Sequence, residues 1–330
     1  MATIKFQTGK EIFDLVKVDL AKVEKEFCQQ SISSVRPITE IGQYLQFSGG
    51  KRLRPALVLL SAKLCGFEGE PAIRLGAVME LIHTATLIHD DVIDEAGTRR
   101  GRPSTNSRWG NHTSVLAGDW LYMQAFNIAL TERNFKILDM LIGLTQEMVE
   151  GELLQMNQLK QINLTEEGYL ELCYRKTACL FSACLRLGPL LNARGEELEI
   201  KLGSYGTNLG LAFQVIDDLL DFTSSEQTLG KPIGSDLREG KITLPLIYLL
   251  GKCTPGEAAK IAQVLEENGF HSVRFNEVIE MIDRYGILED ARAKAQHFAA
   301  LAEQSLEGIP ESHYKDALRS LAEFVVDRQH

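Results

Sequence analysis

Residues 85–94 read ATLIHDDVID, an acidic pattern set in an apolar run, and residues 211–221 repeat the pattern as LAFQVIDDLLD. On a helix the first and last Asp of DDxxD lie four residues apart, so their carboxylates share one face. The two copies consist of Asp90, Asp91 and Asp94, and of Asp217, Asp218 and Asp221.

Carboxylates gathered on an apolar helix face repel one another and are costly to remove from water. A cation must offset their charge. Mg²⁺ bridging to a phosphorylated substrate is the expected one, because hard divalent ions prefer oxygen ligands. One DDxxD alone could equally be a solvated acidic face. Two copies, each preceded by an inward-facing helix wall, favour the metal site.

The composition is that of an ordinary globular protein, with 330 residues, 45% of them hydrophobic and 24% charged. The net charge of -10 argues against nucleic acid as the main partner. We find no run that reaches the roughly 18–20 apolar residues of a membrane span. Residues 1–10 lack the apolar core of a signal peptide. The six cysteines form no CxxC or zinc-like pairing, so we expect a reducing, cytoplasmic location.

Nearly the whole chain has the apolar spacing of helices, and the alternation typical of strands is almost absent. Thr165, followed by two Glu, predicts a helix start, and Gly188-Pro189 predicts where that helix stops. Thr254 and Glu257 fit a capping box. No low-complexity linker divides the chain, so we expect residues 1–330 to form a single all-helical domain.

Basic residues accompany the acidic helices. Arg99-Arg100 and Lys231 lie in the loops directly after the two DDxxD helices, and Lys51 and Arg54 lie in a compact turn before an apolar helix. Each group alone is commonly a solvated charge run. The two loops, however, each place basic side chains just beyond a carboxylate cluster.

Polar residues also occur inside the apolar helices. Lys176-Thr177 lies mid-helix, where a lysine is less expected. His83 falls seven residues before Asp90, and Gln214 falls three before Asp217. Both spacings place the side chain on the acidic stripe.

The order of these motifs resembles the trans (E-type) isoprenyl diphosphate synthases. The matching stretches are GGKRLRP, HTATLIHDDVIDEAGTRRGRP, GDWL, KTA, FQVIDDLLDF and GKPIGSDLREGKITLP. The resemblance implies the isoprenoid synthase fold, a single large all-α bundle around a central cavity. It also implies Mg²⁺-dependent, head-to-tail condensation of isopentenyl diphosphate with an allylic diphosphate.

The resemblance assigns roles position by position. The main metal ligands for two or three Mg²⁺ ions would be Asp90, Asp94 and Asp217, assisted by Asp91, Asp218 and Asp221. The cationic partners of the allylic diphosphate would be Arg99, Lys176, Lys231 and Lys241. The pocket for isopentenyl diphosphate would hold Lys51, Arg54, His83 and Arg100. Thr177 and Gln214 would lie close to the reacting carbons.

Ala85 and Thr86 bear on product length. Short-chain members of the family typically place Phe or Tyr at these positions, which would block a tunnel along the helix. One helical turn of about 5.4 Å matches roughly one isoprene unit. Two small residues therefore predict a long product of about seven to ten units, in the manner of quinone side-chain enzymes. Alternatively, they merely permit close helix packing. The tunnel floor could also lie deeper, at Met123, Phe126, Met148, Leu154 or Met156.

Three other functions remain open at this point. The first is a short-chain synthase making farnesyl or geranylgeranyl diphosphate. The second is the catalytic subunit of a heteromeric synthase. The third is an HD-type metal phosphohydrolase, whose outline His83 and His89-Asp90 match loosely. We expect a homodimer with an interface on helical faces such as 114–129, and a product handed to the membrane.

Overall fold

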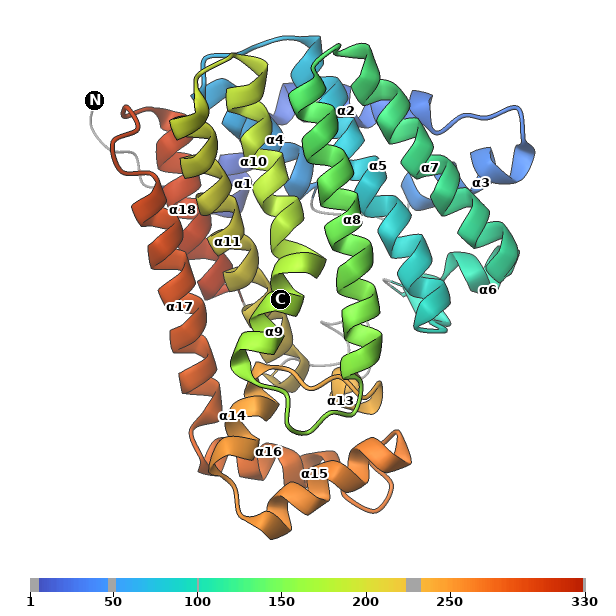
Figure 1. Cartoon of the computed structure of the whole chain (residues 1–330), viewed down its shortest axis with the longest axis vertical. Coiled ribbons are helices and arrows are strands. Elements are labelled where there is room, and N and C mark those ends of the chain that lie inside the picture. The colour runs from blue at the N-terminus through green and yellow to red at the C-terminus, as the bar shows by residue number, and fades with distance from the viewer. Residues whose placement is uncertain (1–5, 47–51, 100, 224–232, 329–330) are drawn as a thin grey trace. The chain divides into compact units, whose positions relative to one another are not determined.

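The computed structural model describes residues 6–46, 52–99, 101–223 and 233–328. In these stretches every regular element is a helix, apart from one short hairpin, which confirms the all-α expectation (Figure 1). The chain divides into two compact units. The first unit takes Met1–Thr145, Leu180–Gly206 and Ser305–Leu321, and the second takes Gln146–Cys179, Thr207–Gln304 and Ala322–His330. The expectation of a single domain stays a prediction.

The first unit is built on a buried central helix, α5 (Glu70–Ile93). Its other helices are α1 (Gly9–Asp14), α2 (Lys17–Gln30), α3 (Arg36–Gln46), α4 (Leu53–Leu64), α6 (Thr105–Trp109) and α7 (Asn111–Thr131). Helices α2, α4 and α7 pack against α5 (Figure 1). By length and composition alone α5 could cross a membrane, contrary to our expectation of no such run. In its apolar window, however, 72% of the residues are buried inside the protein, as in a core helix.

A two-stranded hairpin joins α5 to α6. Strands β1 (Thr98–Arg99) and β2 (Arg102–Pro103) pair antiparallel, with Arg99 opposite Arg102. Gly101 in the turn has a φ of +73°, a left-handed conformation that glycine adopts without strain. The hydroxyl of Tyr44 on α3 donates to the carbonyl of Pro103 at 2.7 Å, which fixes the hairpin against α3.

The second unit contains a separate hydrophobic core between helices α14, α15 and α16. The elements wholly inside this unit are α9 (Glu166–Cys173), the π-helical turn η1 (Tyr174–Ala178), α13 (Ser235–Arg238), α14 (Leu244–Lys252), α15 (Pro255–Glu267) and α16 (Phe275–Arg284). The helices with residues in both units are α8 (Phe135–Gln158), α10 (Cys179–Leu191), α11 (Glu196–Thr223), α17 (Ile287–Ser305) and α18 (His313–Asp327).

Two predicted helix starts are confirmed. Thr165 is the N-cap of α9, where its hydroxyl accepts from the amide of Gly168 at 3.1 Å. Thr254 caps α15, and Glu257 completes the capping box. Each cap satisfies amide groups that a helix start would otherwise leave without partners.

The predicted helix stop at Gly188-Pro189 is wrong, because α10 continues to Leu191 with Pro189 inside it. Proline has no amide hydrogen for the carbonyl of Leu185, four residues earlier. The hydroxyl of Ser61 donates to that carbonyl instead. Gly188 permits the approach, since a Cβ there would lie within 2.5 Å of Ser61 atoms. A partner distant in sequence thus replaces the missing helix bond.

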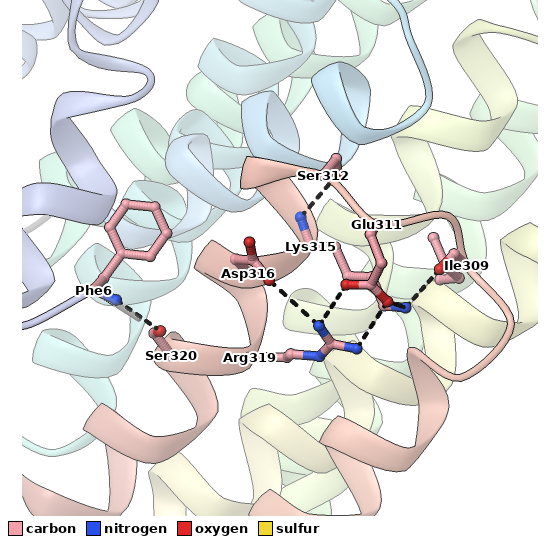
Figure 2. A network of polar contacts seen from close by, with 8 residues as sticks. All are labelled: Phe6, Ile309, Glu311, Ser312, Lys315, Asp316, Arg319 and Ser320. Carbon is pink, nitrogen blue, oxygen red and sulfur yellow. Dashed lines mark hydrogen bonds and ion pairs between the residues drawn. The ribbon is translucent and has the colours of Figure 1, made fainter. Parts of the chain in front are cut away.

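A polar network fixes the start of α18 (Figure 2). Lys315 is buried and donates to the carbonyl of Ile309 and, at 2.6 Å, to the carboxylate of Glu311. Arg319 binds the other oxygen of Glu311 at 2.7 Å. These cations lower the pKa of Glu311 to about 2, with Arg319 the larger cause. The network therefore holds the segment before α18 against the helix.

Candidate active site

The first DDxxD ends α5, and its three carboxylates have different surroundings. Asp91 is buried, with 2% of its surface exposed, whereas Asp90 is half-buried and Asp94 is exposed. The Nε of Arg99 donates to Oδ1 of Asp91 at 2.6 Å. Burial raises the pKa of Asp91, and the charge of Arg99 opposes that rise. Asp91 therefore holds the hairpin through Arg99, and Asp90 and Asp94 are the more accessible pair.

A small cavity of about 40 Å³ lies beside this carboxylate in the first unit. Its walls include His83, Thr84, Asp91, Arg99 and Thr105. His83 and Arg99, both predicted site residues, thus share one cavity.

Arg52, which sequence reasoning passed over, lines the same cavity. It pairs with Glu24 and, at 2.7 Å, with Glu80. Arg54, the residue predicted for the isopentenyl diphosphate pocket, is absent from these walls; its guanidinium lies 5.4 Å from the ring centroid of Phe181. No sequence signal distinguishes the two arginines, because their neighbours are helices distant in sequence.

Three predicted residues, Lys51, Arg100 and Lys231, lie outside the described residues. The two product-length positions lie on α5. Ala85 is fully buried, which is what we would expect if its small side chain serves close helix packing. Thr86 is half-buried, and its hydroxyl donates to the carbonyl of His83 at 2.8 Å.

His89, which the HD-type alternative would use as a metal ligand, contacts residues of α7. Its Nε2 lies 3.2 Å from the carbonyl of Val115 and 3.4 Å from Asp119. Its ring stacks on Tyr122, with centroids 5.8 Å apart. Gly118 makes this contact possible, because a Cβ there would lie 2.3 Å from the His89 ring. His89 thus joins α5 to α7.

The second DDxxD shows a similar division of roles. Asp217 is exposed, while Asp218 and Asp221 are buried. Asp221 accepts from the hydroxyl of Ser235 at 3.0 Å and from the amide of Asp236 at 3.2 Å. It therefore anchors the start of α13.

Asp218 is enclosed by protein donors. The hydroxyl of Tyr169 donates to its Oδ2 at 2.6 Å, and Nε2 of Gln214 donates to its Oδ1 at 2.8 Å. Burial raises the pKa of Asp218 well above its ordinary value, and the charge of Asp236 adds to the rise. Both oxygens thus have a donor from the protein.

Lys176 and Thr177 lie on the π-helical turn η1, a distortion that often marks functional sites. Gly151 of α8 allows the turn to approach closely, since a Cβ there would lie 2.8 Å from Cβ of Arg175. Glu152 and Gln155, also on α8, bind the Lys176 ammonium at 2.8 and 3.0 Å. Sequence reasoning did not predict these two partners.

These groups surround a cavity of about 140 Å³ within the second unit. Its polar walls are Gln155, Gln158, Lys176, Gln214, Asp217, Asp218, Asp236, Lys241 and Thr243. Its apolar walls include Leu159, Leu164 and Leu172. Lys241 also pairs with Glu239 at 2.7 Å. The predicted residues Lys176, Gln214, Asp217 and Lys241 are thus brought to one cavity.

The residues present fit a metal held jointly by protein and substrate. Within the four described stretches, no three His, Cys, Asp or Glu side chains converge as a ready metal site. Mg²⁺ is typically bound by one or two carboxylates together with substrate phosphates, so a complete protein cage is not required. Asp217 is exposed, and Arg328 pairs with it at 3.5 Å, which shows that a cation is accommodated there.

The all-α fold and the two DDxxD motifs define an all-α prenyltransferase. Residues 35–282 match the family model described as polyprenyl synthetase, and the chain belongs to this family. The octaprenyl diphosphate synthase of Escherichia coli (strain K12) is 38% identical over 97% of this chain and 98% of its own. A short chain isoprenyl diphosphate synthase of Methanothermobacter thermautotrophicus is 35% identical over 97% and 99%.

A solved structure is also similar over nearly the full length. The polyprenyl synthase from Caulobacter crescentus, complexed with calcium and isoprenyl diphosphate, is 35% identical to this chain with a TM-score of 0.93. The similarity covers 98% of each chain.

Proposed function

We propose that this chain is a long-chain trans-polyprenyl diphosphate synthase, which extends farnesyl or geranyl diphosphate with isopentenyl diphosphate. The observation that carries the proposal is the cavity of the second unit, whose walls include Asp217, Lys176 and Lys241. A carboxylate for a metal and two ammonium groups for phosphate oxygens are the groups that diphosphate binding requires.

The reaction needs positioning and electrostatics rather than a protein nucleophile. Two or three Mg²⁺ ions, held by Asp90, Asp94 and Asp217, would neutralise the diphosphate and make it a better leaving group. Lys176, Lys241, Arg99 and Lys231 bind the allylic diphosphate. Lys51, Arg54, His83 and Arg100 bind isopentenyl diphosphate.

The chemical step exchanges one bond for another. The C–O bond of the allylic diphosphate breaks, and the double bond of isopentenyl diphosphate attacks the resulting allyl cation. The new C–C bond forms, and a proton passes to the departing diphosphate. Thr177 and Gln214 present polar oxygens to the cation. Apolar walls exclude the water that would otherwise capture it.

Sequence identity alone does not assign the product length, because the matched relatives include an octaprenyl and a short chain synthase at similar identity. Thr86 supports a long product. It is small and only half-buried, so its position is open to a growing chain. We infer about seven to ten isoprene units, a length suited to quinone side chains.

We also propose a homodimer that works in the cytoplasm and passes its apolar product to the membrane. Leu116, Met123 and Leu130 recur every seven residues along α7 and are exposed. Phe135 and Ile142 show the same spacing on α8. Apolar side chains at seven-residue spacing form one helix face, which suits helix–helix association between two copies.

The experiment is condensation by the purified chain, with farnesyl or geranyl diphosphate, labelled isopentenyl diphosphate and Mg²⁺, followed by mass spectrometry of the product. The proposal predicts products of about seven to ten units from the pure chain. Products of three or four units would identify a short-chain enzyme. Activity that returns only with added cell extract would identify a subunit of a heteromeric synthase.

A further inference from the structure

Four side chains of the second unit form a continuous hydrogen-bonded chain from α9 to η1. Tyr169 donates to Asp218 at 2.6 Å, and Gln214 donates to Asp218 at 2.8 Å. The hydroxyl of Thr177 donates to Oε1 of Gln214 at 2.7 Å. Tyr169, Asp218 and Thr177 are buried, and Gln214 is half-buried and lines the 140 Å³ cavity.

The hydrogen bonds converge on Asp218, because Tyr169 donates to it from one side and Gln214 donates to it from the other. Burial, together with the charge of Asp218, raises the pKa of Tyr169 well above its ordinary value, so the phenol keeps its proton. Nε2 of Gln214 donates to Oδ1 of Asp218, so the NH₂ group of the amide faces Asp218. The amide oxygen then faces Thr177, whose own proton is used in that bond.

The orientation of the Gln214 amide decides whether its oxygen or its N–H hydrogens face a neighbouring charge. With this amide orientation, the unshared lone pairs of Gln214 and Thr177 are the groups available to a neighbouring positive charge. If the amide turned over, it would present N–H hydrogens, which repel a developing cation. Preorganised dipoles of the correct sign are among the largest contributions to catalysis.

We propose that Tyr169 is a positioning residue for the condensation, which holds Asp218 so that Gln214 and Thr177 keep their acceptor oxygens toward the reacting carbons. This inference rests on the proposed roles of Gln214 and Thr177. It assigns Asp218 to the support of Gln214 rather than to metal ligation, because the protein already supplies a donor to each of its oxygens.

The test compares two buried tyrosines. Tyr169→Phe removes the hydroxyl that supports Asp218. Tyr205→Phe is the matched control, because Tyr205 is fully buried and its hydroxyl donates to the carbonyl of Leu318 at 2.7 Å, with no site residue involved. We expect Tyr169→Phe to lower kcat by about tenfold or more, with both KM values within about twofold. Tyr205→Phe should lower Tm and leave kcat unchanged.

A double-mutant cycle asks whether Tyr169 acts through Asp218. Asp218→Asn should lower kcat at least as much as Tyr169→Phe, because an asparagine amide can donate to Gln214 and allow its amide to turn over. The double variant should be no slower than Asp218→Asn alone. If the reductions in kcat caused by Tyr169→Phe and Asp218→Asn multiplied in the double variant, the inference would be overturned.

Gln214→Leu separates failure of this inference from failure of the site assignment. If Gln214→Leu lowers kcat while Tyr169→Phe keeps it within twofold, Tyr169 is not a positioning residue. If Gln214→Leu itself leaves kcat unchanged, the proposed role of Gln214 is wrong, and this inference is overturned with it. Condensation would be measured on the full chain with saturating substrates and Mg²⁺.

Discussion

Arg99 and Asp91 are joined by a 2.6 Å hydrogen-bonded ion pair, which ties the hairpin after α5 to the middle carboxylate of the first DDxxD. The partner of this carboxylate comes from the chain itself, only eight residues away. The pair keeps the side chain of Arg99 in the wall of the first-unit cavity.

Asp91→Asn should loosen the hairpin and weaken substrate binding. A hydrogen bond between charged groups contributes about 1.5–3 kcal/mol, and Arg99 is partly exposed, so we expect the lower end of that range. The KM of one or both substrates should rise by about tenfold, while the Mg²⁺ concentration for half-maximal rate stays the same. Asp139→Asn, an exposed aspartate on α8, is the control. A raised Mg²⁺ requirement in Asp91→Asn would show that Asp91 is a metal ligand after all.

Asp221→Asn should destabilise the second unit. The neutral amide would lose the charge-assisted bonds that the carboxylate accepts from the hydroxyl of Ser235 and the amide of Asp236, and hydrogen bonds to charged groups contribute about 1.5–3 kcal/mol. Thermal unfolding checks this, with Ser235→Ala as a milder variant that removes a single bond. An unchanged Tm in Asp221→Asn would contradict the anchoring role.

Thr86→Phe should shorten the product by one or more isoprene units, because the ring would obstruct a chain growing along α5. Thr86→Val is the control, since it removes the hydroxyl bond to His83 but keeps the size. Mass spectrometry of the products gives the answer directly. An unchanged length distribution in Thr86→Phe would remove Thr86 from the tunnel wall. Ala85→Tyr is a poorer test, because Ala85 is fully packed and overpacking destabilises a core.

The Glu311 network predicts a particular loss of stability in acid. The folded-state pKa of Glu311 is lowered from 4.5 to about 2, so the folded protein binds this proton less readily than the unfolded chain. The stabilisation is therefore complete above about pH 4.5 and is lost as the pH falls toward 2. Glu311→Gln should lower Tm at pH 7, and its difference from the native protein should shrink below pH 4.5.

The matched control is Glu307→Gln, on an exposed residue of the same segment. Its Tm should follow the native protein at every pH. If the Tm difference between Glu311→Gln and the native protein did not change with pH, the carboxylate charge would not be what holds Lys315 and Arg319.

Much of the fold was predictable from sequence because helical periodicity and caps are local. Thr165 and Thr254 act as N-caps as expected. The end of α10 was not predictable, because Ser61, far away in sequence, compensates for Pro189.

Four predicted residues, Lys176, Gln214, Asp217 and Lys241, line one cavity, but the sequence does not predict how the roles divide within each DDxxD. DDxxD places three carboxylates on a helix, yet burial and distant partners decide which of them face solvent. The position of Tyr169 could have been noticed from its spacing, because it lies seven residues before Lys176 and so about two helical turns away on the same face. The contacts of Glu152 and Gln155 with Lys176 could not be predicted, because the π-helical turn that carries Lys176 has no recognised sequence pattern.

The most direct measurement is the condensation rate of the purified chain against free Mg²⁺ concentration, for the native protein and for Asp94→Asn and Asp217→Asn. We predict no condensation after chelation and full recovery on adding Mg²⁺. Each variant should need at least about tenfold more Mg²⁺ for half-maximal rate, since each loses one charged oxygen ligand. Undiminished turnover after chelation, or variants with the native Mg²⁺ dependence, would contradict the account.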